Sequence, residues 1–82
     1  MLAPPPLTLL RLSEPMLRGE RVRALQACLT KLGFHPGAQD GVYGPQTASA
    51  VEAFQHAEGL LVDGETGPDT FAALQAKGCV LY

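Results

Sequence analysis

The sequence predicts an all-α domain: a compact three-helix bundle with two structured loops and an extended N-terminal arm. Three observations favour this fold. Apolar residues recur at helical spacing in three segments, and a glycine followed by an apolar residue comes at the end of each. A turn motif, DGxxGPxT, occurs at residues 40–47 and again 23 residues later at 63–70. Its Asp-Gly pair is typical of a tight turn and its Gly-Pro pair of a helix start.

The N-terminal segment, residues 1–17, is expected to form a linker and an extended arm ahead of a domain at residues 18–82. Three consecutive prolines at 4–6 are typical of a stiff linker. Residues 7–17 are mostly apolar and predict a short strand or an extended arm that packs on the core, because Pro15 opposes an early helix. The start lacks the features of a signal peptide, so any export signal is expected outside this sequence.

The first helix is predicted at residues 20–32, with Gly19 as its N-cap. One face of this helix is apolar, formed by Val22, Leu25, Leu29 and Leu32. The pair Gly33-Phe34 predicts a Schellman end, in which the glycine is left-handed and the next residue packs back on the last turn.

The other two helices are predicted at residues 45–58 and 68–77, each starting at the Gly-Pro pair of one motif. Their inward residues are expected to be Thr47, Ala50, Val51 and Phe54 in the former, and Phe71 and Leu74 in the latter. They end at Gly59-Leu60 and Gly78-Cys79, which repeat the pattern of the first helix. Within the two motifs, Gly41 or Gly44, and Gly64 or Gly67, should have positive φ.

Composition and charge exclude several classes of protein. The chain is 46% hydrophobic and 17% charged, as in a globular domain, and its net charge is −2. Five of the six basic residues lie within residues 1–31, whereas the two later helices carry acids and little positive charge, which argues against a nucleic-acid partner. No run approaches the ~20 apolar residues that span a bilayer, so no membrane insertion is expected. We expect a monomer.

From Arg18 to Leu74 the chain resembles the three-helix peptidoglycan-binding domain family. The matching pattern is Gly19-x-x-Val22-x-x-Leu25-Gln26-x-x-Leu29, Gly33-Phe34, Asp40-Gly41-x-Tyr43-Gly44-x-x-Thr47, Ala50-Val51-x-x-Phe54-Gln55, Gly59-Leu60, Asp63-Gly64-x-x-Gly67-x-x-Thr70 and Leu74. The resemblance implies a non-catalytic module that anchors a larger cell-wall enzyme, such as an amidase, lysozyme-like hydrolase or carboxypeptidase, to bacterial peptidoglycan. It also implies a location outside the cell or in the periplasm, at the cell wall.

Candidate ligand-binding residues lie in the first motif: Asp40, Tyr43, Gly44 and Gln46. An exposed Tyr43 beside helix-start N–H groups could stack on a sugar and leave those groups for a carboxylate. The alternative is that Tyr43 packs over the first helix. Gln46 could bond an acetamido group or a peptide carbonyl. The second motif has Thr66 and Asp69 at the equivalent positions, so binding is expected at the first.

The other motif residues are interpreted as structural. Asp40 and Asp63 should bond their own turns, and Thr47 and Thr70 should bond loop backbone. Three glutamines, Gln26, Gln55 and Gln75, each follow an inward apolar residue and should satisfy the polar groups of adjacent loops. Turn and cap positions are Gly19, Gly33, Gly41, Thr47, Gly59, Asp63, Gly64, Gly67, Thr70 and Gly78.

No catalytic or metal-binding pattern is present, and no cofactor is expected. His35 and His56 lack partners at metal-ligand spacing and are interpreted as solvated surface residues. The favoured interpretation of Cys28 and Cys79 is two independent, half-buried small residues, because Cys79 can pack onto Leu74. An exported protein would also permit a disulfide between them.

Two other functions stay open. A helix-turn-helix DNA binder would suit three short helices, but the helices that would enter the groove carry Glu52, Glu58 and Asp69 and no arginine. A protein-docking or propeptide-like regulatory module is the second alternative, since related domains occur in propeptides of some zinc proteases.

Overall fold

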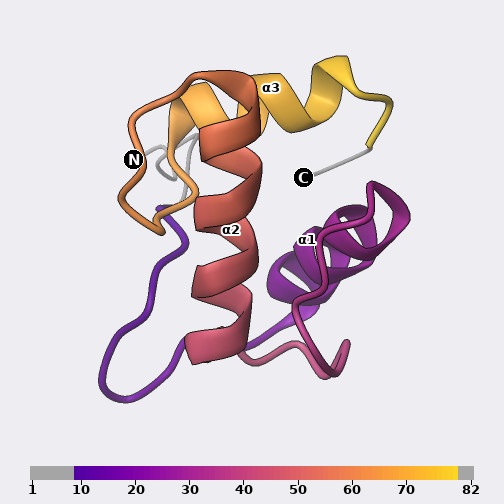
Figure 1. The fold of residues 1–82 in the computed structure, drawn as a ribbon. Coiled ribbons are helices and arrows are strands. Elements are labelled where there is room, and N and C mark those ends of the chain that lie inside the picture. Colours follow the sequence, from indigo (N-terminus) through magenta and orange to yellow (C-terminus); the bar gives the residue numbers. More distant parts are fainter. Residues whose placement is uncertain (1–8, 80–82) are drawn as a thin grey trace, which may run out of the picture.

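Three helices make up the regular structure of the computed structural model, which describes residues 9–79 (Figure 1). They are α1 (Glu20–Lys31), α2 (Pro45–Glu58) and α3 (Pro68–Ala76). The predicted all-α class is confirmed, and α1 and α3 each end one residue before the predicted limit. The linker predicted at residues 1–6 lies outside the described residues. Within residues 9–79 no helix is long and apolar enough to cross a membrane.

The core forms where the inward faces of the helices meet. All the residues predicted to face inward are buried except Leu32, which is half-buried at the end of α1. Phe34, just beyond α1, packs edge-to-face on Phe54 of α2 with 5.7 Å between ring centroids. Leu10 from the N-terminal arm is 3% exposed and also belongs to the core. The arm therefore contributes to packing as well as the helices.

All three helix ends follow the predicted glycine pattern. Gly33, Gly59 and Gly78 have φ of 92°, 72° and 97°, which is the left-handed region. The residue after each glycine donates its N–H back to the last turn: Phe34 to Leu29 O at 2.8 Å, Leu60 to Gln55 O at 2.9 Å and Cys79 to Leu74 O at 3.3 Å. These bonds satisfy carbonyls that a helix end otherwise leaves unpaired.

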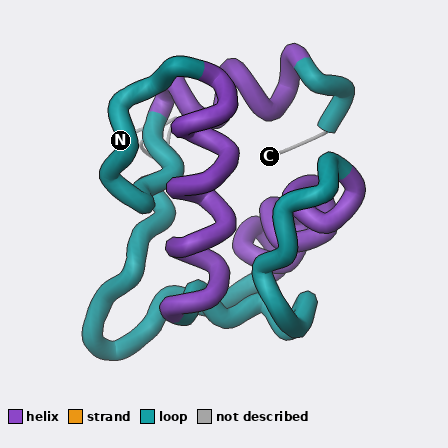
Figure 2. Tube along the Cα trace, in the orientation of Figure 1, coloured by secondary structure: helices purple, strands orange, loops and turns teal. Residues whose placement is uncertain are grey.

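The N-terminal arm runs beside α2 and contacts both motif loops (Figures 1 and 2). Leu10 exchanges two backbone hydrogen bonds with Thr66, at 3.2 and 2.7 Å, and Leu17 O accepts the N–H of Tyr43 at 2.8 Å. These contacts are isolated bridges, Leu10 with Thr66 and Arg18 with Val42, and residues 9–79 contain no β-sheet. Residues 9–17 therefore form an extended arm, which was one of the two predicted structures, and not a short strand.

The favoured interpretation of the two cysteines is wrong, because Cys28 and Cys79 form a disulfide. Their Cα atoms lie 5.8 Å apart, although the residues are 51 positions apart in sequence. Cys79 N–H bonds Leu74 O at the end of α3, as the cap pattern predicts, and the same turn carries its side chain to α1. Packing at the cap and pairing with Cys28 are therefore compatible.

Candidate functional site

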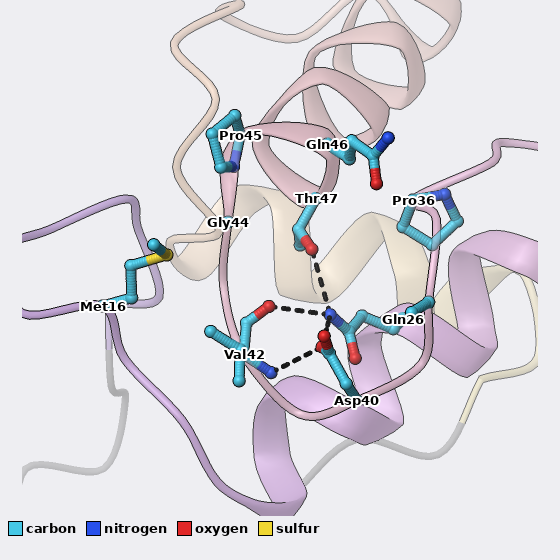
Figure 3. Close-up of a pocket in the computed structure, with 10 residues that line it drawn as sticks. Met16, Gln26, Pro36, Asp40, Val42, Gly44, Pro45, Gln46 and Thr47 are labelled. Atoms are coloured by element: carbon cyan, nitrogen blue, oxygen red, sulfur yellow. Dashed lines mark hydrogen bonds between the residues drawn. The ribbon is translucent and has the colours of Figure 1, made fainter.

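A buried glutamine of α1 holds the first motif loop in place. The side-chain Nε2 of Gln26 donates to Val42 O at 2.9 Å, Thr47 Oγ1 at 3.0 Å and Asp40 Oδ1 at 3.3 Å. Its Oε1 accepts the N–H of Gly41 at 2.8 Å. Gln26 is 1% exposed, so these bonds replace the water that its amide would otherwise bind. Figure 3 shows the Nε2 atom facing its three acceptors.

Gln55 of α2 holds the second loop in the same way. Its Nε2 donates to Asp63 Oδ1 at 2.9 Å, Glu65 O at 2.9 Å and Thr70 Oγ1 at 3.1 Å, and its Oε1 accepts the N–H groups of Asp63 and Gly64. The predicted role of these two glutamines is confirmed. Thr47 and Thr70 were predicted to bond loop backbone, and this partner is wrong. Each hydroxyl accepts from a glutamine amide, which in turn bonds the loop.

Gln75 differs from the other two glutamines because it lies on the exposed side of α3. The loops that Gln26 and Gln55 hold precede α2 and α3. The role predicted for Gln75, satisfying the polar groups of an adjacent loop, stays a prediction.

The aspartate that opens each motif holds its own turn, as predicted. Asp40 Oδ1 accepts the N–H of Val42 at 3.0 Å, and Asp63 Oδ1 accepts the N–H of Glu65 at 2.9 Å. These backbone donors, followed by the glutamine amides, lower the pKa of both carboxyl groups. Gly41 and Gly64 have φ of 76° and 73°, so the positive φ predicted within each motif falls on its first glycine.

Tyr43 corrects the prediction of an exposed aromatic residue, because its side chain is 0% exposed. Its hydroxyl donates to Gly64 O at 2.7 Å and lies 3.3 Å from Thr66 Oγ1, both in the second motif. Burial raises its pKa to about 12. Tyr43 therefore connects the two loops through the interior and is not placed to stack on a sugar. It belongs to the same buried core cluster as Val22 and Leu25 of α1.

The other three candidates, Asp40, Gly44 and Gln46, line one pocket of about 310 Å³ beside the start of α2 (Figure 3). Its remaining lining is mainly apolar and comes from the arm, α1, the segment 36–42 and α2: Met16, Gln26, Pro36, Ala38, Val42, Pro45 and Thr47. Met16 and Pro36 were not expected at this site from the sequence. A signal for Met16 existed in the arm, which was expected to pack on the core, but its register against the loop could not be derived.

Gln46 supplies this pocket with a side-chain amide that is available to a ligand. It is exposed, and its amide makes no hydrogen bond or ion pair to the described part of the chain. A Cβ at residue 37 would collide with the Gln46 amide, so a glycine there, with φ of 84°, lets that side chain lie across the loop. The pocket thus has apolar walls, the amide of Gln46 and the carboxylate of Asp40. This combination suits a ligand that carries a neutral polar group on an apolar part.

The two histidines, His35 and His56, are exposed, as predicted, and neither lines this pocket. Across residues 9–79, no group of three or more His, Cys, Asp or Glu side chains could hold a metal ion. The polar chemistry of the pocket is therefore that of Gln46, Asp40 and the backbone at the start of α2.

Comparison with known proteins gives the family. A family model described as "Putative peptidoglycan binding domain" matches residues 18–74, and the chain belongs to this family. The N-acetylmuramoyl-L-alanine amidase CwlL of Bacillus licheniformis is 42% identical over 78 residues, which cover 88% of this chain and 22% of the amidase.

Solved structures agree with this assignment. The SleB N-terminal domain superposes with a TM-score of 0.78 at 36% identity, covering 85% of this chain and 92% of that one. A Burkholderia AP3 phage endolysin gives a TM-score of 0.77 at 40% identity, covering 85% of this chain and 26% of the endolysin. The chain spans about a quarter of the length of the curated amidases CwlL and CwlA that it matches.

Proposed function

We propose that this chain is a non-catalytic module that binds bacterial peptidoglycan through the pocket lined by Asp40, Gly44 and Gln46. The observation that carries the proposal is the position of the Gln46 amide, exposed and unbonded within the described chain, at the edge of an apolar pocket. The amide can accept from and donate to an acetamido group or a peptide bond. Met16 and Pro36 supply apolar surface on either side (Figure 3).

The same proposal covers the setting of the module. Residues 18–82 form the binding domain and residues 1–17 a linker and arm, within a larger secreted enzyme that acts on the cell wall. The match to amidases and an endolysin several times longer than this chain supports a tethered module. A disulfide is typical of proteins outside the cytoplasm, which supports an extracellular or periplasmic location. The module acts as a monomer. One copy is sufficient, because tethering raises the effective concentration of the enzyme at the cell wall.

Retention on purified insoluble peptidoglycan tests this function. We expect wild-type protein to be retained without releasing soluble fragments. Gln46→Ala should reduce retention several-fold, because one ligand hydrogen bond is worth about 0.5–1.5 kcal/mol. Ala38→Trp should reduce it further, because the indole fills the pocket from the exposed loop.

Gln75→Ala is the matched control, since it removes an exposed glutamine from α3, outside the pocket. It should be retained like the wild type, and circular dichroism should show that all variants are folded. Absence of wild-type retention would overturn the function. Retention that is equal for wild type, Gln46→Ala and Ala38→Trp would place binding elsewhere on the domain.

A further inference from the structure

A second pocket of about 210 Å³ lies beside the start of α3, at the opposite end of α2 from the first. The two pockets occupy equivalent positions in the two motifs. Asp63 and Gly67 in the second correspond to Asp40 and Gly44 in the first. Because α2 has 14 residues, the pockets are separated by about 20 Å along it.

The arm contributes equivalently to both pockets. A Cβ at Gly67 would lie 3.5 Å from Leu9, and a Cβ at Gly44 would lie 3.7 Å from Met16 Sδ. The next residue of the arm forms backbone hydrogen bonds with the loop in both cases. Leu10, which follows Leu9, bonds Thr66, and Leu17, which follows Met16, bonds Tyr43. The glutamine-held loop is likewise the same in both. The framework is therefore shared, and differences between the pockets lie in the side chains that line them.

Those differences change the charge of the second pocket. Val42 of the first is replaced by Glu65, and Gln46 is replaced by Asp69. Three carboxylates, Asp63, Glu65 and Asp69, line the second pocket, whereas Asp40 is the single charged residue lining the first. The apolar part of the second pocket includes Leu9 and Leu61, which are 42% and 80% exposed.

We infer that the second pocket is a subsite for a primary ammonium group at the end of an aliphatic chain. The exposed leucines can cover the methylene groups, and the carboxylates can receive the ammonium. A metal ion is a poorer occupant, because the carboxylates form no group that could hold one. The inference deepens the proposed function and rests on it for the source of the ligand, an amino-bearing component of the cell wall.

The charges around the pocket leave its carboxylates accessible. Arg11 of the arm lies 3.9 Å from Glu65, with both side chains more than one-third exposed, so water and an incoming ammonium can compete for the carboxylate. Asp69 is exposed and makes no ion pair with the described residues. The Glu65 carboxylate is therefore shared with Arg11, whereas the Asp69 carboxylate is open to a ligand.

The test is titration of the ¹⁵N-labelled domain with Nα-acetyl-L-lysine amide, followed by NMR shifts of residues 60–70. The matched probe is Nα-acetyl-L-norleucine amide, which keeps the aliphatic chain and lacks the ammonium. We expect the lysine probe to bind weakly and saturably in the second pocket, and the norleucine probe to bind at least several-fold more weakly.

The matched variant is Glu65→Val with Asp69→Gln, which gives the second pocket the residues of the first at these two positions. Since a partly exposed charge pair strengthens binding by up to about fivefold, this change should weaken binding of the lysine probe on the order of tenfold. Glu14→Gln with Glu20→Gln removes the same charge outside the pocket and should leave binding within about twofold of wild type. Both double variants should fold, because neither changes a residue whose side chain is buried.

The outcomes separate this inference from the proposed function. Equal shifts with both probes, or equal losses in both double variants, would overturn the ammonium subsite. Retention on peptidoglycan that depends on Gln46, without lysine-probe binding, would leave the proposed function standing and remove the subsite. Lysine-probe binding without peptidoglycan retention would support the subsite chemistry and overturn its assignment to the cell wall.

Discussion

Two buried glutamines show how single residues specify this fold. Gln26 and Gln55 each bond a loop carbonyl, a loop N–H, the turn aspartate and a helix-start threonine. One side chain thus satisfies several polar groups that the motif buries. Within the described residues, no buried side-chain nitrogen or oxygen lacks a partner.

Replacing Gln55 with alanine should therefore be costly. The change leaves the N–H of Gly64 and the hydroxyl of Thr70 without their partner, and we expect it to lower the free energy of unfolding by about 2–4 kcal/mol. Urea unfolding followed by circular dichroism measures this. Gln46→Ala is the control here, because this exposed amide bonds no described residue, and it should cost less than about 0.5 kcal/mol. Similar midpoints for the two variants would contradict the role assigned to Gln55.

Tyr43 makes the folded state sensitive to alkaline pH. Burial raises its pKa from 10.0 to about 12, so the folded protein favours the neutral phenol. This contribution to stability is complete below the unfolded pKa of about 10 and is lost as the pH rises through the folded pKa of about 12.

We accordingly expect the free energy of unfolding to fall by on the order of 2–3 kcal/mol between pH 10 and pH 12 through this group. Tyr43→Phe should lose about 1 kcal/mol near neutral pH, where the hydroxyl bonds Gly64 O, and should show less of the alkaline loss. Urea unfolding at several pH values measures both. An alkaline loss of equal size in the phenylalanine variant would assign it to other groups.

At the scale of elements, local signals were sufficient to predict the helices and loops. The glycine caps at the helix ends and the Asp-Gly turns depend on residues within a few positions of one another. Their conformations could therefore be predicted from the sequence. The disulfide and the inward course of Tyr43 depend on which segments meet in space. Thr66, the counterpart of Tyr43, is also fully buried, but comparing tyrosine with threonine gave no reason to expect a shared buried position.

The disulfide should contribute more to stability than any one helix end. It closes a loop between Cys28 and Cys79, 51 positions apart, and loops of this size typically yield about 2–4 kcal/mol. Cys28→Ser with Cys79→Ser should lower the free energy of unfolding by that amount in non-reducing urea titrations. Adding a reductant should destabilise the wild type and leave the double variant unchanged. A wild type unaffected by full reduction, verified by mass spectrometry, would contradict this.

At the scale of the whole molecule, the fold presents two equivalent pockets at the two ends of one helix. Sequence comparison of the motifs indicated that the copies differ in charge, and it placed Asp40, Gly44 and Gln46 together. It could not show that the arm completes both pockets, because the contacts of Leu9 and Met16 depend on long-range pairing.

The disulfide also determines how the domain responds to a pulling force. A tension applied between the N-terminal arm and residue 79 passes through α1 only as far as Cys28 and then crosses the sulfur–sulfur bond directly to Cys79. The 51 positions between them would add about 170 Å of extensible chain if they were unlinked. With the bond in place, α2 and α3 are outside the line of force. Leu9 and Met16 of the arm lie within it, so tension acts on the two pockets through the arm while the load passes to residue 79 through a covalent bond.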